Sequence, residues 1–371
     1  MSSPKYSILI VGPSWVGDML MAQSLFKALA AREVGIEAGL ELDVLAPAWS
    51  HGILARMPEV RRALVAPFTH GSFGLKERWR LGRDLAREGY DQAIVLPNSW
   101  KSALVPFFAG IPLRTGYLGE FRHGLLNDKR RLDKQGMPRL VERYADLAFP
   151  AWRSADTVGI SPTPLLQRGA GGISPTIRPA LGPGVPPQPR LAVHPEAQQA
   201  TLTRLGLNRE RRILALCPGA EFGPAKRWPE AHYAAVARAK LEQGWQVWLF
   251  GSAKDKAVTD TINHLTGDLC ANLAGQTTLE ETVDLLACAA AVVSNDSGLM
   301  HIAAAVDVPL VAVYGSTDPG YTPPYSDKAQ VVRLGLECSP CFKRECPLGH
   351  LDCLNKLGAE RVLEVMPGCV E

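Results

Sequence analysis

Short apolar runs alternate with segments of helical periodicity along most of the chain, and this alternation limits the possible fold more than any other feature. Strands that alternate with helices of this length form parallel βαβ units. In the first half, the expected strands are Tyr6–Val11, Leu42–Ala46, Ala63–Pro67 and Gln92–Leu96. The expected helices there are Met19–Arg32, Leu75–Glu88, Ser102–Ala109 and Pro138–Phe149.

The second half repeats the alternation of strands and helices after a stretch of different composition. The stretch "SPTPLLQRGAGGISPTIRPALGPGVPPQP" is dense in proline and glycine and has no apolar period, which is typical of a connector. We therefore predict an N-terminal domain (1–160), a linker region (161–205), a C-terminal domain (206–350) and a closing C-terminal helix (351–371). The strands expected in the second half are Arg212–Leu216, Gln246–Phe250, Ala291–Ser294 and Pro309–Tyr314. The expected helices are Ala231–Gln243, Lys254–Thr266, Leu279–Cys288, Gly298–Ala305 and Ala359–Val365.

Composition narrows the class of protein. The chain has 371 residues, 46% hydrophobic and 21% charged, and no stretch reaches the roughly 18 uninterrupted apolar residues of a membrane span. We expect a cytoplasmic protein. The net charge of +3 divides into +5 over residues 1–160 and −2 over the rest, which is too weak for a nucleic-acid-binding domain. A mildly basic first half suits an anionic small molecule or membrane surface, although ordinary surface variation explains it equally well.

The stretch "VGPSWVGDM" has glycines spaced as in a phosphate-binding Walker A loop, but it does not continue as one. That loop requires lysine followed by serine or threonine, and here Asp18 and Met19 take those places. A carboxylate would repel a phosphate, so the loop must serve another purpose. The simplest alternative is that Asp18 caps the helix that follows.

Two loops after predicted strands of the second half carry groups suited to an anion. In "SNDSGLMHIAAA" a strand ends at Ser294 and a helix begins near Gly298, so that free N–H groups at the helix start favour a pyrophosphate. The alternative is a plain N-cap by Asn295, Asp296 and Ser297. In "CPGAEFGPAKRWP" the cation Lys226 can neutralise a leaving diphosphate, or simply be solvated. A third strand-end loop, "LFGSAKD", suits a nucleoside.

Taken together, "GPSWVGDM", "LPNSWKSALVPFFAGIPLRTGY", "PGAEFGPAKRWP", "FGSAKD" and "NDSGLMHIAAA" resemble the ADP-heptose:lipopolysaccharide heptosyltransferases of glycosyltransferase family 9. The resemblance runs in order from Ile8 to Tyr314, with the proline-rich linker poorly matched. It implies a GT-B fold, in which two Rossmann-like doubly wound domains face each other across a cleft. It also implies an inverting transfer from ADP-L-glycero-β-D-manno-heptose to the first heptose of the Kdo2-lipid A inner core, without a metal or other cofactor. The implied partners are these two substrates and, peripherally, the inner leaflet of the membrane.

The resemblance also implies roles for single residues. Asp18 matches the family's general base, which takes the proton from the acceptor hydroxyl. Lys226 matches a lysine that stabilises the departing ADP, and Asp296 matches a carboxylate that holds the heptose hydroxyls. The ribose contact is in doubt because Ala253 stands where some relatives have glutamate, which leaves Ser252 or Asp255 as substitutes. The remaining positions implied for donor binding are Glu221, Phe222, Gly251, Ser252, Ser297, Gly298 and His301.

For the anionic acceptor, the first half offers a set of basic residues. Lys101 and Arg114 are the preferred candidates, because both are expected next to strand ends facing the cleft. Trp15 and Trp100 can stack on sugars or simply pack. The other basic candidates, any of which can be a plain surface charge, are Arg56, Arg61, Arg62, Lys76, Arg78 and Arg122.

Four of the eight cysteines crowd into "CSPCFKRECPLGHLDC". The pair Cys338 and Cys341 has the spacing of zinc ligands, but the distances in sequence to Cys346 and Cys353 follow no standard pattern. Zinc, an oxidised pair and reduced thiols all remain open, with reduced thiols the default in cytoplasm.

Other functions are also compatible with two such domains. A related transferase would add the first heptose to Kdo, and a nucleotide-sugar epimerase would share the architecture. A non-catalytic nucleotide-binding module could use the cysteines as a zinc knuckle. A Rossmann oxidoreductase is disfavoured, because no G-x-G-x-x-G follows any predicted strand.

Overall fold

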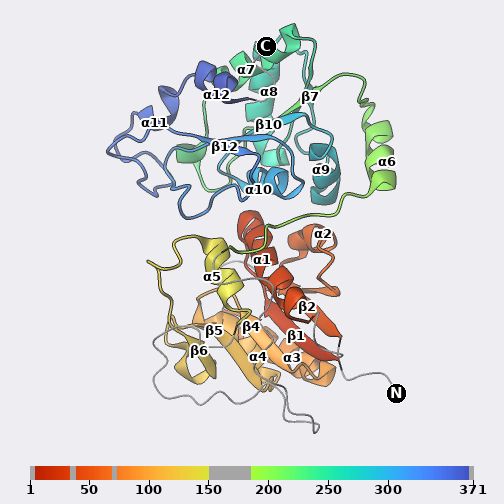
Figure 1. Ribbon diagram of the computed structural model, residues 1–371, viewed down its shortest axis with the longest axis vertical. Coiled ribbons are helices and arrows are strands. Elements are labelled where there is room, and N and C mark those ends of the chain that lie inside the picture. The colour runs from red at the N-terminus through yellow and green to blue at the C-terminus, as the bar shows by residue number, and fades with distance from the viewer. Residues whose placement is uncertain (1–4, 34–38, 69–72, 150–184, 367–371) are drawn as a thin grey trace. The chain divides into compact units, whose positions relative to one another are not determined.

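The computed structural model describes residues 5–33, 39–68, 73–149 and 185–366. Contacts divide the chain into two compact units, and each contains one parallel sheet with helices packed against it (Figure 1). The first unit comprises residues 1–14 and 21–187, and the second comprises residues 15–20 and 188–371. The α/β class predicted from the alternating pattern is thus confirmed. The segment 15–20, which contains Asp18, is grouped with the second unit.

The first sheet has the order β3-β2-β1-β4-β5-β6, and every strand pair in it is parallel. The order reverses between β1 and β4, so that the loops after these two strands leave the sheet side by side. Leu9 of β1 and Ala93 of β4 pack on Leu85 and Val105 in the core. The strands are β1 Tyr6–Val11, β2 Leu40–Ala46, β3 Arg62–Val65, β4 Gln92–Val95, β5 Leu113–Tyr117 and β6 Asp128–Arg130. The helices are α1 Val16–Glu33, α2 His51–Leu54, α3 Leu75–Leu85, α4 Leu104–Phe108 and α5 Leu140–Asp146.

The second sheet has the order β12-β11-β10-β7-β8-β9, again with every strand pair parallel. Here the order reverses between β7 and β10. Helices α7, α8 and α12 pack together, and α9 packs with α6 and α10. The strands are β7 Ile213–Cys217, β8 Gln246–Leu249, β9 Ala271–Asn272, β10 Ala291–Asn295, β11 Leu310–Val313 and β12 Ala329–Val332. The helices are α6 Pro195–Leu205, α7 Glu230–Glu242, α8 Lys256–Leu265, α9 Leu279–Leu286, α10 Gly298–Ala305, α11 Asp352–Asn355 and α12 Ala359–Val365.

All predicted strands and helices occur within a few residues of their expected bounds, but several elements are additional. Strands β5, β6, β9 and β12 were not predicted. The first part of the predicted linker, residues 161–184, lies outside the described residues. Residues 195–205, which the prediction places in the linker, form α6, and α6 packs on α9 of the second unit. The segment predicted as a closing helix contains the two short helices α11 and α12.

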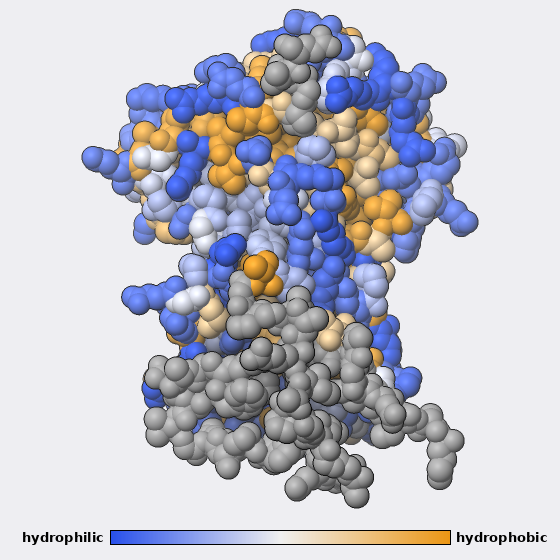
Figure 2. Space-filling view, in the orientation of Figure 1, coloured by the Kyte–Doolittle hydropathy of each residue, from blue (hydrophilic) through white to orange (hydrophobic). Residues whose placement is uncertain are grey.

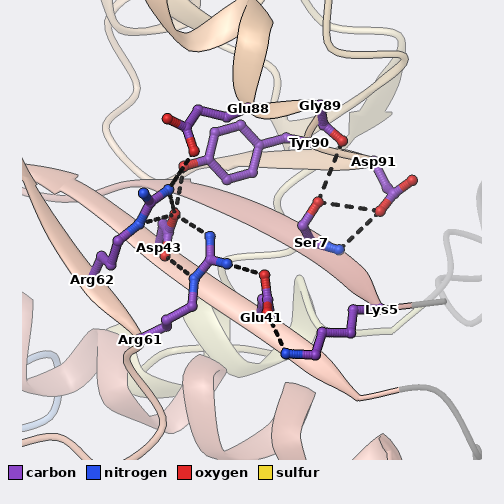
Figure 3. A network of polar contacts seen from close by, with 10 residues as sticks. All are labelled: Lys5, Ser7, Glu41, Asp43, Arg61, Arg62, Glu88, Gly89, Tyr90 and Asp91. Carbon is purple, nitrogen blue, oxygen red and sulfur yellow. Dashed lines mark hydrogen bonds and ion pairs between the residues drawn. The ribbon is translucent and has the colours of Figure 1, made fainter. Parts of the chain in front are cut away.

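A network of charged residues joins the amino ends of the first four strands of the first sheet (Figure 3). Its centre is Asp43, which is fully buried and accepts hydrogen bonds from Arg61, Arg62 and the Tyr90 hydroxyl. Because both arginines are held by carboxylates at this edge, Arg61 and Arg62 stabilise the sheet. The prediction that they belong to an acceptor-binding set is therefore not supported.

The surface of the second unit is mixed. In the view of Figure 2, apolar side chains gather around β12 and α11, and polar side chains surround them. None of the helices in the described part of the chain is long and apolar enough to cross a membrane.

Candidate active site

The loops that follow β7 and β10 form the centre of the candidate site in the second unit. These strands are neighbours, with Ser294 of β10 opposite Cys217 of β7, and they flank the point where the strand order reverses. In open parallel sheets, ligands bind outside the carboxyl ends of the strands at this reversal. The stretches "PGAEFGPAKRWP" and "NDSGLMHIAAA", in which the sequence predicted donor-binding residues, therefore lie together, as expected.

Asn295 joins the two loops. Its side chain is fully buried, and its Nδ2 donates to the Pro218 carbonyl over 2.6 Å. Its Oδ1 accepts from the Trp228 backbone N–H at 3.1 Å and from the Tyr233 hydroxyl at 3.0 Å. Both ends of the loop between β7 and α7 are thus fixed to the end of β10. A buried amide with this many partners makes the loop geometry rigid.

Lys226 and Asp296 form an ion pair within this rigid frame. The Lys226 Nζ lies 2.5 Å from Asp296 Oδ2, and both side chains are largely buried. The same carboxylate oxygen accepts the Thr317 hydroxyl at 2.5 Å. Ser297 is the N-cap residue of α10, but its side chain makes no capping hydrogen bond. The prediction that the Asp296 and Ser297 side chains cap this helix is therefore wrong, and Asp296 faces the lysine instead.

Two glycines allow the start of α1 to pack against α10. A Cβ atom on Gly17 would lie 2.5 Å from Cδ2 of His301, and a Cβ on Gly298 would lie 2.7 Å from the Val16 Cβ. Real side chains do not approach so closely, so either substitution would force the His301 ring or the Val16 side chain to move. The two glycines thus leave room for these side chains between the start of α1 and α10.

Asp18 stands in the first turn of α1, two residues after the helix begins at Val16. It is therefore not the N-cap residue, which was the simplest alternative for its role. Burial raises the pKa of Asp18 from 3.8 to about 6, the negative charge of Asp296 raises it further, and the positive charge of Lys226 opposes both. The structure thus brings all three residues predicted to be catalytic within electrostatic range of one another.

His301 lies one turn into α10 with its ring against Gly17. Burial lowers the pKa of His301 to about 4, and the charge of Lys226 lowers it further against the opposing effect of Asp296. The ring is therefore neutral at pH 7, where it can donate or accept a hydrogen bond without adding charge.

The remaining loop residues predicted to bind the donor lie around this pair. The Phe222 ring lies beneath two cations, with Lys226 Nζ at 4.9 Å and the Arg344 guanidinium at 5.4 Å. Such a position suits a ring that holds the lysine in place. Glu221 is exposed and pairs with Lys254 over 2.8 Å.

The loop after β8 is organised by Asp255. Its Oδ2 accepts the backbone N–H of Ser252 at 2.9 Å and the Ser252 hydroxyl at 2.7 Å. A Cβ on Gly219 or on Gly251 would lie within 2.8 Å of the Asp255 side chain. Gly251 is thus required for packing, and Ser252 and Asp255 hold each other. Which of the two contacts a ribose stays a prediction.

In the first unit, Lys101 and Arg114 have different surroundings. Lys101 lies in the short 3-10 helix Trp100–Ala103 that follows β4, beside the reversal of strand order. Arg114 is the second residue of β5 and pairs with Ala93 near the start of β4. Its guanidinium donates to the carbonyls of Ile111 and Leu125. The premise that Arg114 lies at a carboxyl strand end is therefore wrong, and the arginine instead fixes the turns around β5.

Other basic candidates are also committed to the fold. Arg78 is buried and donates to the carbonyls of Phe73 and Lys101. Arg122 is fully buried and donates to the Pro97 carbonyl at 2.6 Å. Burial lowers the pKa of Arg122 to about 10. These arginines shape the loop that presents Lys101.

Sequence reasoning did not single out Thr317, which orients Asp296, and it named Asn295 only as part of a cap. Asn295 is the last residue of the buried strand β10. Thr317 lies in the loop that follows the buried strand β11. A polar side chain at the carboxyl end of a buried strand is the signal that points to both.

Comparisons with known proteins agree with this geometry. The family model for glycosyltransferase family 9 (heptosyltransferase) matches residues 78–166 and 179–352. The chain is 46% identical over 363 residues, 96% of each protein, to lipopolysaccharide heptosyltransferase 2 of Escherichia coli K12. It is 34% identical over 155 residues, 38% of this chain and 41% of the relative, to lipopolysaccharide heptosyltransferase 1 of Pseudomonas aeruginosa. The solved structure of the E. coli ADP-heptose lipopolysaccharide heptosyltransferase II superposes with a TM-score of 0.78 at 44% identity, covering 97% of both chains.

Proposed function

The chain belongs to glycosyltransferase family 9, the heptosyltransferases, and from this membership we propose that it transfers heptose from ADP-heptose to the first heptose of the lipopolysaccharide inner core. The observation that carries the proposal is the full-length similarity to a heptosyltransferase 2. The similarity to a heptosyltransferase 1 covers less than half of the chain, so addition of the first heptose to Kdo is the weaker alternative. Membership of a glycosyltransferase family also argues against an epimerase and against a module without catalytic activity.

We propose that the donor occupies the loops after β7, β8 and β10. The diphosphate would lie at the amino end of α10, where helix N–H groups and the helix dipole favour an anion. Lys226 stands beside that helix start, because it pairs with Asp296, the residue before the N-cap. Ser252 and Gly251, in the loop after β8, would contact the nucleoside. The heptose would then face Asp296.

In the proposed reaction, an acceptor hydroxyl oxygen attacks the anomeric carbon of heptose on the face opposite ADP. The bond between that carbon and the diphosphate oxygen breaks, its electron pair leaves with ADP, and the configuration inverts. Asp18 takes the hydroxyl proton as the new bond forms. Lys226 and the start of α10 stabilise the charge that develops on ADP, a task that Mg²⁺ performs in other transferases. No metal is needed for this transfer.

The electrostatics of Asp18 suit a general base. With a pKa of about 6, the carboxylate is ionised in most molecules at pH 7 to 8. It is nevertheless about two pKa units more basic than an ordinary aspartate, which strengthens its pull on the hydroxyl proton. An ordinary aspartate would be fully ionised but a weaker base, and a lysine in its place would be protonated and unable to accept the proton.

We further propose that the first unit meets the lipid acceptor at the inner membrane leaflet, on the cytoplasmic side. The exposed side of α3 combines the apolar side chains of Leu75 and Trp79, both about half exposed, with the cations Lys76, Arg80 and Arg83. Aromatic and basic residues on one surface suit an anionic lipid interface. This contact would be peripheral.

A complementation experiment tests the proposed acceptor. The chain is expressed in a Gram-negative strain that lacks its own heptosyltransferase 2, and separately in one that lacks heptosyltransferase 1. The mass of the isolated core should increase by a heptose only in the first strain. Rescue of only the second strain would establish the alternative acceptor, and rescue of neither by folded protein would contradict the proposal.

A further inference from the structure

Four thiols surround one small cavity in the second unit, and Ala225, the residue before Lys226, also lines it. The side chains of Cys338, Cys341, Cys346 and Cys353 all line it, together with His350. The first three lie in the loops between β12 and α11, and Cys353 lies in α11. All four are free thiols. Their spacing in sequence follows no standard pattern, so the fold, rather than the spacing, shows that they converge.

The surroundings of the thiols suit a cation. Cys346 Sγ accepts the backbone N–H of Leu351 at 3.4 Å, the kind of contact that holds a thiolate ligand in place. The four sulfurs come from four positions around one cavity, and thiolate sulfur is the soft ligand that zinc prefers in structural sites.

We propose that Cys338, Cys341, Cys346 and Cys353 together bind one soft divalent metal ion, with zinc as the expected occupant. Four thiolates in a tetrahedron form a closed structural zinc site, which leaves no open position for catalysis. Among the described residues, no group of three or more such side chains stands ready to bind a metal, so binding must draw the thiols inward by side-chain rotation. None of the four proposed ligands is among the residues proposed to react.

The expected role of the ion is to hold the segment 338–353 against the donor loop. The Arg344 carbonyl accepts the backbone N–H of Ala225 at 3.0 Å and lies where any side chain on Gly223 would fall. The Arg344 guanidinium lies over Phe222, whose ring also contacts Lys226. Loss of the ion should therefore loosen the loop that carries Lys226 and weaken donor binding, without removing a group that reacts.

Metal analysis of the purified full-length protein tests the proposal directly. After expression in zinc-supplemented medium, elemental mass spectrometry should find about one zinc per chain. Cys341→Ser and Cys353→Ser should each lose most of it. Cys288→Ser is the matched control, because Cys288 lies outside the cluster and the variant should retain the metal.

Cobalt provides a second measurement that does not depend on how well the variants fold. Wild-type protein stripped of metal and loaded with Co²⁺ should show the intense thiolate-to-cobalt absorption of a four-sulfur tetrahedral site. A wild-type protein that contains no metal and shows no such band would overturn the proposal. So would two disulfides, counted as four missing thiols among the eight cysteines after denaturation without reductant. Metal content is read without any activity assay, so its outcome is separate from that of the proposed transfer.

Discussion

Replacing Asp18 by asparagine should abolish transfer and at the same time stabilise the fold. The substitution keeps the shape of the side chain and removes its charge. Because burial is the main reason that the pKa of Asp18 is raised to about 6, the ionised carboxylate is a cost to the folded state. An amide in the same place does not carry that cost. Activity and stability should therefore change in opposite directions.

The size and the pH dependence of the stabilisation follow from the shift in the pKa of Asp18. A rise from 3.8 to about 6 corresponds to about 3 kcal/mol at most, and because the side chain is only partly buried from solvent we expect about 2 kcal/mol. The folded state binds the proton more tightly than the unfolded chain does. The cost is therefore absent below the unfolded pKa of 3.8 and fully present above about 6. The gain from Asp18→Asn should appear at pH 7.5 and vanish near pH 3.5.

Thermal unfolding and a transfer assay measure the two effects. For a unit of this size, about 2 kcal/mol should raise the melting temperature by roughly 4 to 8 °C at pH 7.5. Loss of the base should slow transfer by about 10²- to 10⁴-fold. Glu77→Gln, an acid-to-amide change at an exposed position in the first turn of α3, is the control and should shift stability by less than about 0.5 kcal/mol. An Asp18→Asn variant that melts below the wild type at pH 7.5, or that transfers heptose at the wild-type rate, would refute this reasoning.

Three further substitutions test the site. Lys226→Met should weaken ADP-heptose binding, measured by calorimetry. It should also move the acidic limb of the pH–rate profile to higher pH, because the lysine lowers the pKa of Asp18. An unmoved limb would contradict the electrostatic coupling between Lys226 and Asp18. Gly17→Ala should lower kcat/KM at least tenfold, because its Cβ would overlap the His301 ring and displace it. Gly124→Ala, where the added Cβ meets open space, should leave kcat/KM unchanged. Asn295→Ala should lower the free energy of unfolding in urea by about 2 to 4 kcal/mol, because three buried polar groups lose their partner. A loss below about 1 kcal/mol would show that other contacts hold the loop.

The order of strands and helices could be predicted because buried parallel strands are continuous apolar runs. Strands β1, β7 and β10 have this character, and they set the two reversals of strand order that position Asp18, Lys226 and Asp296. The missed strands lie at or near sheet edges and lack such runs. Strand β6 is Asp-Lys-Arg and β9 has only two residues, so no apolar period marks them.

Parts of the site could not be predicted because they depend on contacts between distant segments. That Gly17 faces His301 follows from packing that no local pattern encodes. Arg114 was expected beside a strand end, but it stands near the start of β5, a strand that the sequence pattern did not predict. The cysteine spacing alone left three interpretations open, and only the fold places all four thiols around one cavity.

The most direct test of the whole account is the mass of the product made by the purified wild-type enzyme. The protein is incubated with ADP-heptose and monoheptosylated Kdo2-lipid A without added metal salts, with unheptosylated Kdo2-lipid A in a parallel reaction. The expected product is the monoheptosylated acceptor with one heptose added, with no extension of the unheptosylated acceptor and one ADP released for each product. Extension of only the unheptosylated acceptor, or no product from either acceptor by enzyme that still binds ADP, would contradict it.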